Sequence, residues 1–478
     1  ELPSEEYSLY FELPEYAVHR IGPFELLPDS PREWVVELVR LQVPLTRPLA
    51  GLDTISVEYG MVREQVQSLP VLLGSEGRTS VDKLLGLVPG MNPVDSLELD
   101  PMTGRASAVS ANGSRSSAIN YQFDGAPNNA QNRLTGAQAA TFAPVPDAIE
   151  TFRVITHTYS AAEGRNAGAV VLPSSRTTGD RLHGGLRGFY RPYGKAIESY
   201  DGANDALKGW AGGGQLGGPL WAKHNLNFFF DAELWKTEQR HFGVYDVLST
   251  AERSGDLSAL TTAPRDPDTR TAFPNGLIPQ DRLSPLMQKY LNTFVPQANA
   301  GQHVFQGRDD MPSDGQTLLA RIDKGWKKFS LSASHLTYRA YGASPLPGAM
   351  QGASSQRRQL ANNTRIALQH TPTAELVQTT QISGQRLSIS LWQGVTDHRD
   401  VTANEFGFDF APFGADPGTI PDLTLYDDSG RRRMLVAPFL GAEQSVQTTW
   451  QIRHDLEWRR GGYAARFGAS YQQGGWPF

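Results

Sequence analysis

The amino-acid sequence predicts a mostly β protein built from several domains. A chain of 478 residues is longer than one ordinary domain. Its 47 glycines and 32 prolines, together with 10% aromatic residues, suit many short strands joined by turns. After residue 178, apolar and polar residues alternate in run after run, and this period of two is that of a β-strand.

The clearest alternation lies in residues 225–235 and 449–459, and a further run over 463–472 follows a predicted hairpin at 460–462. Strands of about ten residues with one apolar and one charged face suit an outer-membrane β-barrel. A soluble β-sandwich shows the same alternation, so these runs alone leave both architectures open. In the first run one face carries Leu226, Phe228, Phe230, Ala232 and Leu234, and the other carries Asn227, Phe229, Asp231 and Glu233.

Composition and charge exclude several classes of protein. The net charge of −6, with no basic stripe, argues against a nucleic-acid partner, because phosphate binding needs clustered Lys and Arg. The absence of cysteine excludes thiol catalysis, thiolate metal sites and disulfides. No run of about 18 apolar residues exists, which excludes a transmembrane helix but not transmembrane strands.

Motifs for enzymatic chemistry are also missing. The ten histidines form no pair at helical metal spacing, and no phosphate-binding loop is present. We therefore expect no catalytic residue, no cofactor and no metal site. The glycines at 212–214 and 217–218 indicate a strand of small residues facing a neighbouring domain, and the acidic pairs at 266–268, 309–310 and 427–428 indicate solvated turns more readily than calcium ligands.

Residues 146–171 read PDAIETFRVITHTYSAAEGRNAGAVV and carry the most specific signal in the chain. A short acidic and apolar run leads through Tyr159, Glu163 and Gly164 to a patch of small residues that allows close backbone packing. This stretch resembles the plug domain of TonB-dependent outer-membrane transporters. The resemblance favours the outer-membrane barrel over the soluble sandwich.

Further landmarks follow in the order of that family and resemble its Oar-like branch over nearly the whole chain. This branch carries a carboxypeptidase-regulatory-like β-sandwich, a carbohydrate-binding-like fold, before its plug, and residues 1–50 are similar to the end of such a module. The landmarks are Leu69-Pro70, Pro89-Gly90, Asn112 to Arg115, Phe123-Asp124-Gly125, Asn128-Asn129, Leu182-His183-Gly184, Phe189-Tyr190-Arg191, Leu216 to Pro219, Phe228 to Phe230, Glu252 to Ser258, Asp266-Pro267, Phe273-Pro274-Asn275 and Ile278-Pro279.

The resemblance implies a partial antiparallel transmembrane β-barrel with an N-terminal mixed α/β plug and the remnant of a β-sandwich. Roughly nine alternating runs follow Leu182, against about 22 strands in a plugged barrel, so we expect a fragment of a longer receptor, cut at both ends. The expected segments are the sandwich remnant at 1–52, a linker at 53–66, the plug at 67–178 and the barrel at 179–478.

Local patterns refine these segments. Within the plug we expect a helix over 81–87, a turn at Asp124-Gly125 and a buried strand over 149–155. The connections over 244–313 and 391–443 are long and rich in Pro, Gly and Asp, and we expect them to be extracellular loops.

The resemblance also implies partners and contact residues. The segment Asp53, Thr54, Ile55, Ser56 and Val57 resembles a TonB box, whose extended β-branched peptide adds a strand to TonB, although a sandwich strand or linker would explain it equally well. The expected partners are TonB with its inner-membrane energising complex, outer-membrane lipid and an unknown extracellular ligand. Contacts of the plug apex with ligand are expected from Asn112, Ser114, Arg115, Asn128, Asn129, Asn132 and Arg133.

The leading functional hypothesis is a TonB-dependent outer-membrane receptor that binds an extracellular ligand and imports it with energy transduced by TonB. The first alternative is a structural or adhesive outer-membrane surface barrel. The second is a soluble carbohydrate-binding β protein, although residues 1–50 show no aromatic platform for a sugar. The sequence favours no particular ligand, because fold alone does not determine cargo.

Overall fold

A computed structural model of the chain provides the fold. No helix among the residues that it describes is long and apolar enough to cross a membrane. The described residues are 6–11, 19–25, 57–68, 73–74, 77–78, 81–93, 109–115, 118–131, 138–142, 144–159, 161–163, 167–179, 181–192, 206–345, 354–394, 406–407, 423–426, 432–436 and 443–475.

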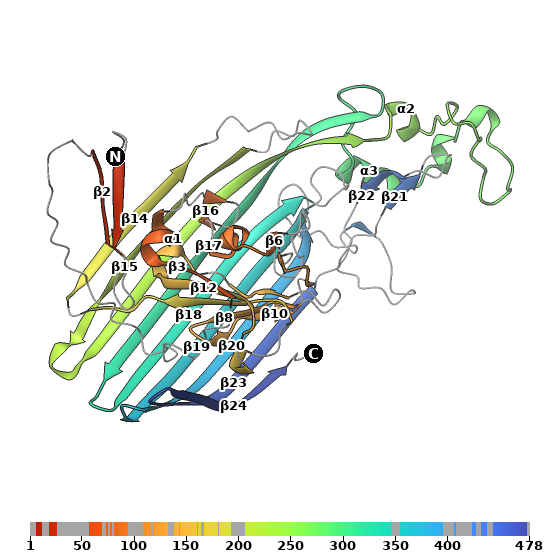
Figure 1. Ribbon diagram of the computed structural model, residues 1–478. Coiled ribbons are helices and arrows are strands. Elements are labelled where there is room, and N and C mark those ends of the chain that lie inside the picture. The colour runs from red at the N-terminus through yellow and green to blue at the C-terminus, as the bar shows by residue number, and fades with distance from the viewer. Residues whose placement is uncertain are drawn as a thin grey trace.

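Nine antiparallel strands form one curved sheet, which we name the wall (Figure 1). Neighbouring strands follow each other in chain order, so short turns alternate with long connections. The short turns lie at residues 222–225, 326–328, 374–375 and 461–462, and the first contains the 3-10 helix η5 (Ala222–His224). The strands are β14 (His183–Arg191), β15 (Ala206–Trp221), β16 (Leu226–Asp246), β17 (Val304–Gly325), β18 (Phe329–Pro345), β19 (Ser354–Thr373), β20 (Leu376–Gly394), β23 (Glu443–Arg460) and β24 (Tyr463–Gly475).

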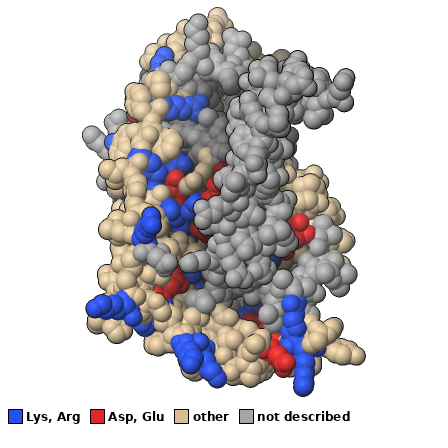
Figure 2. Space-filling view, turned by 60° about the vertical axis from the view of Figure 1, so that its left-hand side comes forward, with Lys and Arg blue, Asp and Glu red and all other residues tan. Residues whose placement is uncertain are grey.

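Strand β16 shows how the wall distributes its side chains. Asp231 and Glu233 are buried, whereas Phe230 and Leu234 are about half exposed. A soluble sandwich would bury the apolar face, so this inverted pattern confirms the barrel interpretation. Lysine and arginine side chains also project along the lower edge of the molecule (Figure 2).

The wall strands are longer than the ten residues that the sequence suggested. All except β14 span 13 to 22 residues. A tilted strand needs only about 9–11 residues to cross the hydrocarbon. The wall therefore extends beyond the apolar band. In β16, for example, the outward positions continue after Leu234 with Lys236, Glu238 and Arg240.

A second domain, residues 57–179, lies on the concave side of the wall, and we name it the plug (Figure 1). Its mixed sheet has the order β3-β12-β13-β8-β9 and a core of its own that includes Leu85, Ile119 and Phe152. The expected helix, turn and buried strand are all confirmed. Its elements are β3 (Val57–Val62), α1 (Arg63–Ser68), β4 (Leu73–Gly74), β5 (Gly77–Arg78), η1 (Val81–Leu87), β6 (Met91–Pro93), β7 (Val109–Ala111), β8 (Asn120–Phe123), β9 (Ala126–Pro127), β10 (Asn129–Gln131), β11 (Gln138–Ala140), η3 (Pro146–Ala148), β12 (Ile149–His157), η4 (Ala161–Glu163) and β13 (Val170–Ser175).

The expected linker is folded from residue 57 onwards. Strand β3 forms an edge of the plug sheet and pairs antiparallel with β12. Tyr59 and Met61, two residues apart and hence on the same face of the strand, pack against the plug core. The plug sheet therefore begins on the N-terminal side of the expected boundary at residue 67.

The connection between β16 and β17 contains helices, although the sequence suggested only loop. Ser249 and Glu252 form a capping box at α2 (Thr250–Arg253), and Ser284 caps α3 (Pro285–Phe294). Tyr290 and Phe294 of α3 pack on Phe406 from the connection between β20 and β23, so the two long connections share one apolar cluster. The remaining elements of these connections are η6 (Pro274–Gly276), η7 (Gln280–Arg282), β21 (Leu423–Tyr426) and β22 (Arg432–Val436).

Two strands are described before residue 57. Strand β1 (Glu6–Phe11) pairs antiparallel with β2 (His19–Glu25). The sequence predicts three apolar strand segments in the sandwich remnant, at residues 7–13, 23–27 and 34–43, and β1 and β2 overlap the first two. The third expected segment, residues 34–43, lies outside the described residues.

Candidate functional site at the interface between plug and wall

The plug contacts the polar inner face of the wall through two groups of side chains. One group is charged and lies on β14 and β16, and the other consists of neutral amides on β19 and β20. An apolar cluster, which includes Phe142 of the plug and Phe229 and Leu336 of the wall, is also shared by the two domains. Since the plug also has a core of its own, its docking contacts are separable from the contacts that fold it.

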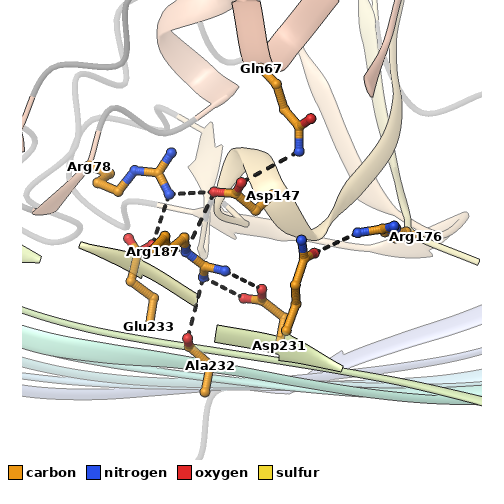
Figure 3. Close-up of polar contacts among 9 residues, drawn as sticks. Gln67, Arg78, Asp147, Arg176, Arg187, Asp231, Ala232 and Glu233 are labelled. Carbon is orange, nitrogen blue, oxygen red and sulfur yellow. Dashed lines mark hydrogen bonds and ion pairs between the residues drawn. The ribbon is translucent and has the colours of Figure 1, made fainter. Parts of the chain in front are cut away.

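Arg187 is the centre of the charged group (Figure 3). Its two terminal nitrogens donate to the two carboxylate oxygens of Asp231, at 2.7 and 2.9 Å. Its Nε donates to Glu233 Oε2 at 2.8 Å. Asp231 and Glu233 project to the same side because they are two residues apart on β16. One guanidinium therefore holds two buried carboxylates of the wall.

Two plug residues complete this group, which we name the ionic cluster: Arg78, Asp147, Arg187, Asp231 and Glu233. Arg78 Nη1 donates to Glu233 Oε2 at 3.0 Å and also pairs with Asp147. Asp147 Oδ2 lies 3.5 Å from Arg187 Nε, so each domain supplies an acid to an arginine of the other (Figure 3).

The ionic cluster contains two arginines and three carboxylates and is largely buried, with Asp231 and Glu233 at most 1% exposed. Buried ion pairs add little net stability when complete, because desolvation offsets the Coulombic attraction. Loss of one partner is expensive, since it leaves an uncompensated buried charge. The cluster therefore favours one seated position of the plug over any slightly displaced position.

Gly213 of β15 makes room for Arg187. A Cβ atom added at Gly213 would lie 2.3 Å from the backbone oxygen of Ala232 and 3.0 Å from Arg187 Nη2. At Gly217 an added Cβ would lie 2.4 Å from Thr178 Cγ2 of the plug. At Gly212, on the opposite face, it would meet nothing closer than 3.9 Å. Gly217 thus faces the plug as the sequence suggested, and Gly213 leaves space for the Arg187 guanidinium.

Asp124 forms a second polar contact with the wall. It lies in the β8–β9 turn with φ of +52°, followed by Gly125 with φ of +77°. The backbone N–H and the hydroxyl of Ser175 both donate to its carboxylate at 2.7 Å. On the wall side, Ser334 Oγ donates to Asp124 at 3.2 Å and Arg321 donates to Ser175 Oγ at 2.8 Å.

Four amide side chains of the wall bind backbone carbonyls of the plug, and we name them the amide row. Each donates one hydrogen bond of 2.7–2.9 Å and is at least nine-tenths buried. Their backbone acceptors place no demand on the plug side chains, because every residue carries a carbonyl. The pairs are Gln359 with Thr141 O, Asn363 with Pro127 O, Gln381 with Gly125 O and Gln385 with Asn129 O.

Two further plug side chains have perturbed ionisation. Burial raises the pKa of Glu150, and its Oε2 has no hydrogen-bond partner among the described residues. Burial lowers the pKa of Arg176, whose Nη1 donates to Gln215 of the wall at 2.7 Å. The shift at Glu150 favours its neutral form, whereas Arg176 remains charged, because arginine is not deprotonated in proteins.

The structure separates the residues that the sequence suggested for ligand contact. Asn112 and Arg115 are exposed and Ser114 is half-buried. Asn112 adopts φ of +49° and donates to the backbone oxygen of Thr156 at 3.1 Å, which fixes this loop on β12. Asn112 and Arg115 are thus exposed in a loop that is held against β12.

The other suggested contacts have internal roles or fall outside the described residues. Asn128 is buried and donates to the backbone oxygen of Phe142 at 3.0 Å. Asn129 accepts from the backbone N–H of Tyr121 at 2.8 Å. Asn132, Arg133 and the first four residues of the TonB-box-like segment, Asp53, Thr54, Ile55 and Ser56, lie outside the described residues, and Val57 begins β3.

Sequence reasoning did not identify Arg78, Arg187 or the amide row. Asp231 and Glu233 gave a partial signal, because they are charged residues at inward positions of a strand with an apolar opposite face. Arg78, the plug partner of Glu233, is 155 residues away from it in the chain. No local pattern reports a contact at that separation.

The acidic pair at 266–268 lies in a turn as expected, and Asp266 and Asp268 both accept from Arg282 at 2.8 Å. The pair at 309–310 was expected in a turn but lies within strand β17, where Asp310 pairs with Arg240 of β16 at 3.0 Å. No group of three or more His, Asp or Glu residues in the described ranges is arranged to hold a metal ion. Asp427 and Asp428 lie outside those ranges.

Comparisons with known proteins agree with this architecture. The outer membrane beta barrel domain family matches residues 179–476, which is more than half of the chain. The TonB-dependent receptor plug domain family matches residues 71–171. A search of curated proteins finds no match.

Among solved structures, the chain is similar to the outer membrane transporter YddB from Escherichia coli, with 12% identity and a TM-score of 0.52 over 87% of this chain and 48% of that chain. The ferric yersiniabactin uptake receptor FyuA from Yersinia pestis matches with 10% identity and a TM-score of 0.45 over 88% of this chain and 61% of that chain. The chain thus spans about half the length of YddB, and the likeness to YddB shows the fold. On the two family matches and this fold, the chain belongs to the TonB-dependent receptors of the outer membrane, which are not enzymes, and consists of a plug domain followed by strands of an outer-membrane β-barrel.

Proposed function

We propose that the full-length receptor imports an extracellular ligand when TonB pulls the plug out of its seated position. The observation that carries this proposal is that the plug has an apolar core of its own, apart from the apolar cluster that it shares with the wall. We expect the plug to keep this core when its contacts with the wall are broken. Those contacts include the ionic cluster and the amide row, whose groups can exchange protein partners for water.

The proposed coupling segment, residues 53–57, lies at the start of a continuous path to the wall. Val57 begins β3, which is hydrogen-bonded along β12. Strand β12 follows η3 directly, and η3 contains Asp147 of the ionic cluster. A pull on the segment therefore acts on the plug edge strand and then on the ion pairs of Asp147 with Arg78 and Arg187.

The finer assignments are part of the same proposal. The order of landmarks along the chain supports the Oar-like branch, and the β1–β2 pair supports a sandwich module before the plug. The exposed loop that holds Asn112, Ser114 and Arg115 supports ligand contact at the plug apex. The proposed boundaries remain 1–52, 53–66, 67–178 and 179–478, with strand β3 of the 53–66 segment joining the plug sheet.

Uptake in cells that lack the energising complex tests the proposal. We expect uptake to be lost in those cells while ligand binding at the cell surface remains. Unchanged uptake, or no uptake in any strain, would support the structural or adhesive barrel instead. Membrane fractionation provides the control that the receptor is present at equal levels in both strains.

Ile55→Pro in the full-length receptor tests the coupling segment. Proline cannot donate to an added strand, so we expect binding without transport. Ile55→Val is the matched control, because it keeps an extended β-branched residue. Transport by the proline variant would place the coupling segment elsewhere.

A removable tether tests plug movement itself. The chain contains no cysteine, and Ser334 Oγ of the wall lies 3.2 Å from the Asp124 carboxylate of the plug. We expect Asp124→Cys with Ser334→Cys to block uptake when oxidised and to restore it on reduction. The reduced protein controls for the lost hydrogen bonds, and full uptake by the oxidised protein would contradict movement of this part of the plug.

A further inference from the structure

Arg365 of β19 is a buried arginine whose hydrogen-bond partners are all neutral. It is 1% exposed and lies on the inner face of the wall. Its Nε donates to Gln381 Oε1 at 2.9 Å and its Nη1 donates to Ser332 Oγ at 3.1 Å, while its Nη2 has no hydrogen-bond partner in the part of the chain that the structure describes. Arg187, in contrast, donates to two carboxylates. A buried guanidinium without a carboxylate in contact retains a strong attraction for an anion.

The register of the wall places Arg365 next to the point at which the plug presents Asp124. Ser334 of β18 is the register partner of Arg321 on β17 and of Arg365 on β19. Ser334 Oγ donates to the Asp124 carboxylate at 3.2 Å, and Arg321 Nη1 lies 3.8 Å from Oδ1 of the same group. Because neighbouring strands are about 4.8 Å apart, the backbones of the two arginines are separated by about 10 Å. A carboxylate of the plug therefore occupies the strand between two arginines.

Asp124 balances a charge that the wall leaves over at this row. Asp323 of β17 accepts from Nε and Nη2 of Arg321 at 2.8 and 2.9 Å, so these two wall residues neutralise each other. Strands β18 to β20 contain no aspartate or glutamate that could do the same for Arg365. When Asp124 leaves with the plug, the row keeps one positive charge in excess.

Strand β16 has the opposite excess. One wall arginine, Arg187, binds the two carboxylates of Asp231 and Glu233. Movement of the plug removes Arg78 together with Asp147, its partner in the plug, and leaves one wall carboxylate unbalanced. The inner surface exposed by this movement is therefore positive around Arg365 and negative around Asp231.

We propose that Arg321, Ser334, Arg365 and Ser383, which we name the anion row, bind an oxyanion group of the cargo, such as a carboxylate, in the place that Asp124 vacates. Ser383 is the register partner of Arg365 on β20, and its buried hydroxyl has no hydrogen-bond partner among the described residues. Guanidinium and hydroxyl groups bind such an anion through charge-assisted hydrogen bonds. The proposal rests on the proposed function, because the anion row becomes free only when the plug moves.

Ser383→Cys in the full-length receptor tests the charge of the row, because the chain contains no cysteine that would compete for a thiol reagent. The probes are sulfonatoethyl methanethiosulfonate, which is negative, and its trimethylammonioethyl analogue, which is positive. Each labelling rate in energised cells is divided by the rate of the same reagent with 2-mercaptoethanol. We expect the negative reagent to be favoured about tenfold, since the Cβ atoms of register partners are about 5 Å apart and the Arg365 charge attracts one reagent and repels the other.

Matched variants separate the charge of Arg365 from other effects. S383C/R365Q is expected to lose the preference and S383C/R365K to keep it. S383C/R386Q removes the same charge from the exposed outer face of β20 and is expected to keep it as well. Gln215→Cys, opposite Asp231 on β15, is expected to favour the positive reagent. Heat-induced mobility shifts on gels report the folded fraction of each variant.

Two results would overturn the proposal in different ways. Labelling of S383C without a charge preference, or with the same preference in S383C/R365Q, would overturn the anion row and leave plug movement intact. No labelling of S383C by either reagent in energised cells would show that the plug does not leave this part of the wall. That result would overturn the proposed function, and the anion row with it.

Discussion

The ionic cluster and the amide row hold the same plug against the same wall by different chemistry. In the ionic cluster, charged side chains of both domains depend on one another, and Arg187 donates to both Asp231 and Glu233. In the amide row, neutral wall side chains bind plug backbone, as Gln381 binds Gly125 O. The ionic cluster requires particular side chains in both domains, whereas the amide row requires particular side chains only in the wall.

The two regions therefore resist displacement of the plug in different ways. Displacing a buried ion pair leaves charges without partners until water arrives, so the ionic cluster resists the first small movement most strongly. A neutral amide loses about one hydrogen bond and regains it with water. We therefore expect the ionic cluster to set the threshold for plug displacement and the amide row to contribute in small, similar steps.

Arg187→Met gives the sharpest contrast between the two regions. It leaves Asp231 and Glu233 buried without their main partner, and we expect the free energy of unfolding of the full-length receptor to fall by about 3–5 kcal/mol. Chemical denaturation in detergent measures this change. Arg460→Met is the control, because Arg460 is exposed and its pair with Glu375 contributes at most about 1 kcal/mol. Similar losses of unfolding free energy in both variants would show that the ionic cluster contributes no more than an exposed ion pair.

Gly213→Ala disturbs the same cluster sterically and leaves its charges unchanged. The new methyl group would clash with the backbone oxygen of Ala232 and press on Arg187, and we expect a loss of about 1–3 kcal/mol in the same unfolding experiment. Gly212→Ala, on the opposite face of β15, should be close to neutral. If Gly212→Ala lowers the free energy of unfolding equally, the loss comes from replacing any glycine of β15 and not from the contact with Arg187.

Gln359→Leu and Gln385→Leu weaken the amide row one hydrogen bond at a time. Each leaves one plug carbonyl without its wall donor, and we expect each to lower the free energy of unfolding by about 1–2 kcal/mol. Gln444→Leu, at an exposed position of β23, is the control. A loss as large as that of Arg187→Met would show that the two regions do not differ in the way described above.

Glu150→Gln tests the pH dependence of the interface and has the smallest expected effect. Because burial raises the pKa of Glu150 above its usual 4.5, its stabilising contribution is complete below that value and is lost as the pH rises through the raised pKa. The glutamine variant should lack this loss and be the more stable protein at neutral pH. Denaturation midpoints of both proteins, measured from acidic to neutral pH, report this difference in stability. Curves of midpoint against pH that run parallel for the two proteins would contradict the prediction.

The wall was largely predictable from sequence because alternation is a local property. The inverted burial of Phe230 and Asp231 follows from the period of two, and the hairpin turn at 461–462 follows from two adjacent glycines. The longer strands were missed because the alternation is less regular beyond the apolar band, where Lys236, Glu238 and Arg240 occupy the outward positions of β16. Helix α3 was missed within a Pro-rich stretch, although Ser284 followed by Pro285 is a recognisable start signal.

The docking contacts were not predictable from sequence. Gln359 and Gln385 look like any polar residue at an inward position, and their partners are backbone atoms, which leave no signal in a sequence. Arg78 and Glu233 become partners only after two separate domains have folded and met. A periodic pattern identifies the inner face of the wall, but not which atom of the plug lies opposite.

Recognition of main-chain carbonyls also gives the two partners unequal freedom to evolve. A substitution in the plug at 125, 127, 129 or 141 keeps the acceptor atom, so selection on this side acts on the backbone path and on the glycine conformation at 125. A substitution of Gln381 removes the donor outright. Among homologues, drift is therefore expected on the plug side of each pair, with retention of an amide on the wall.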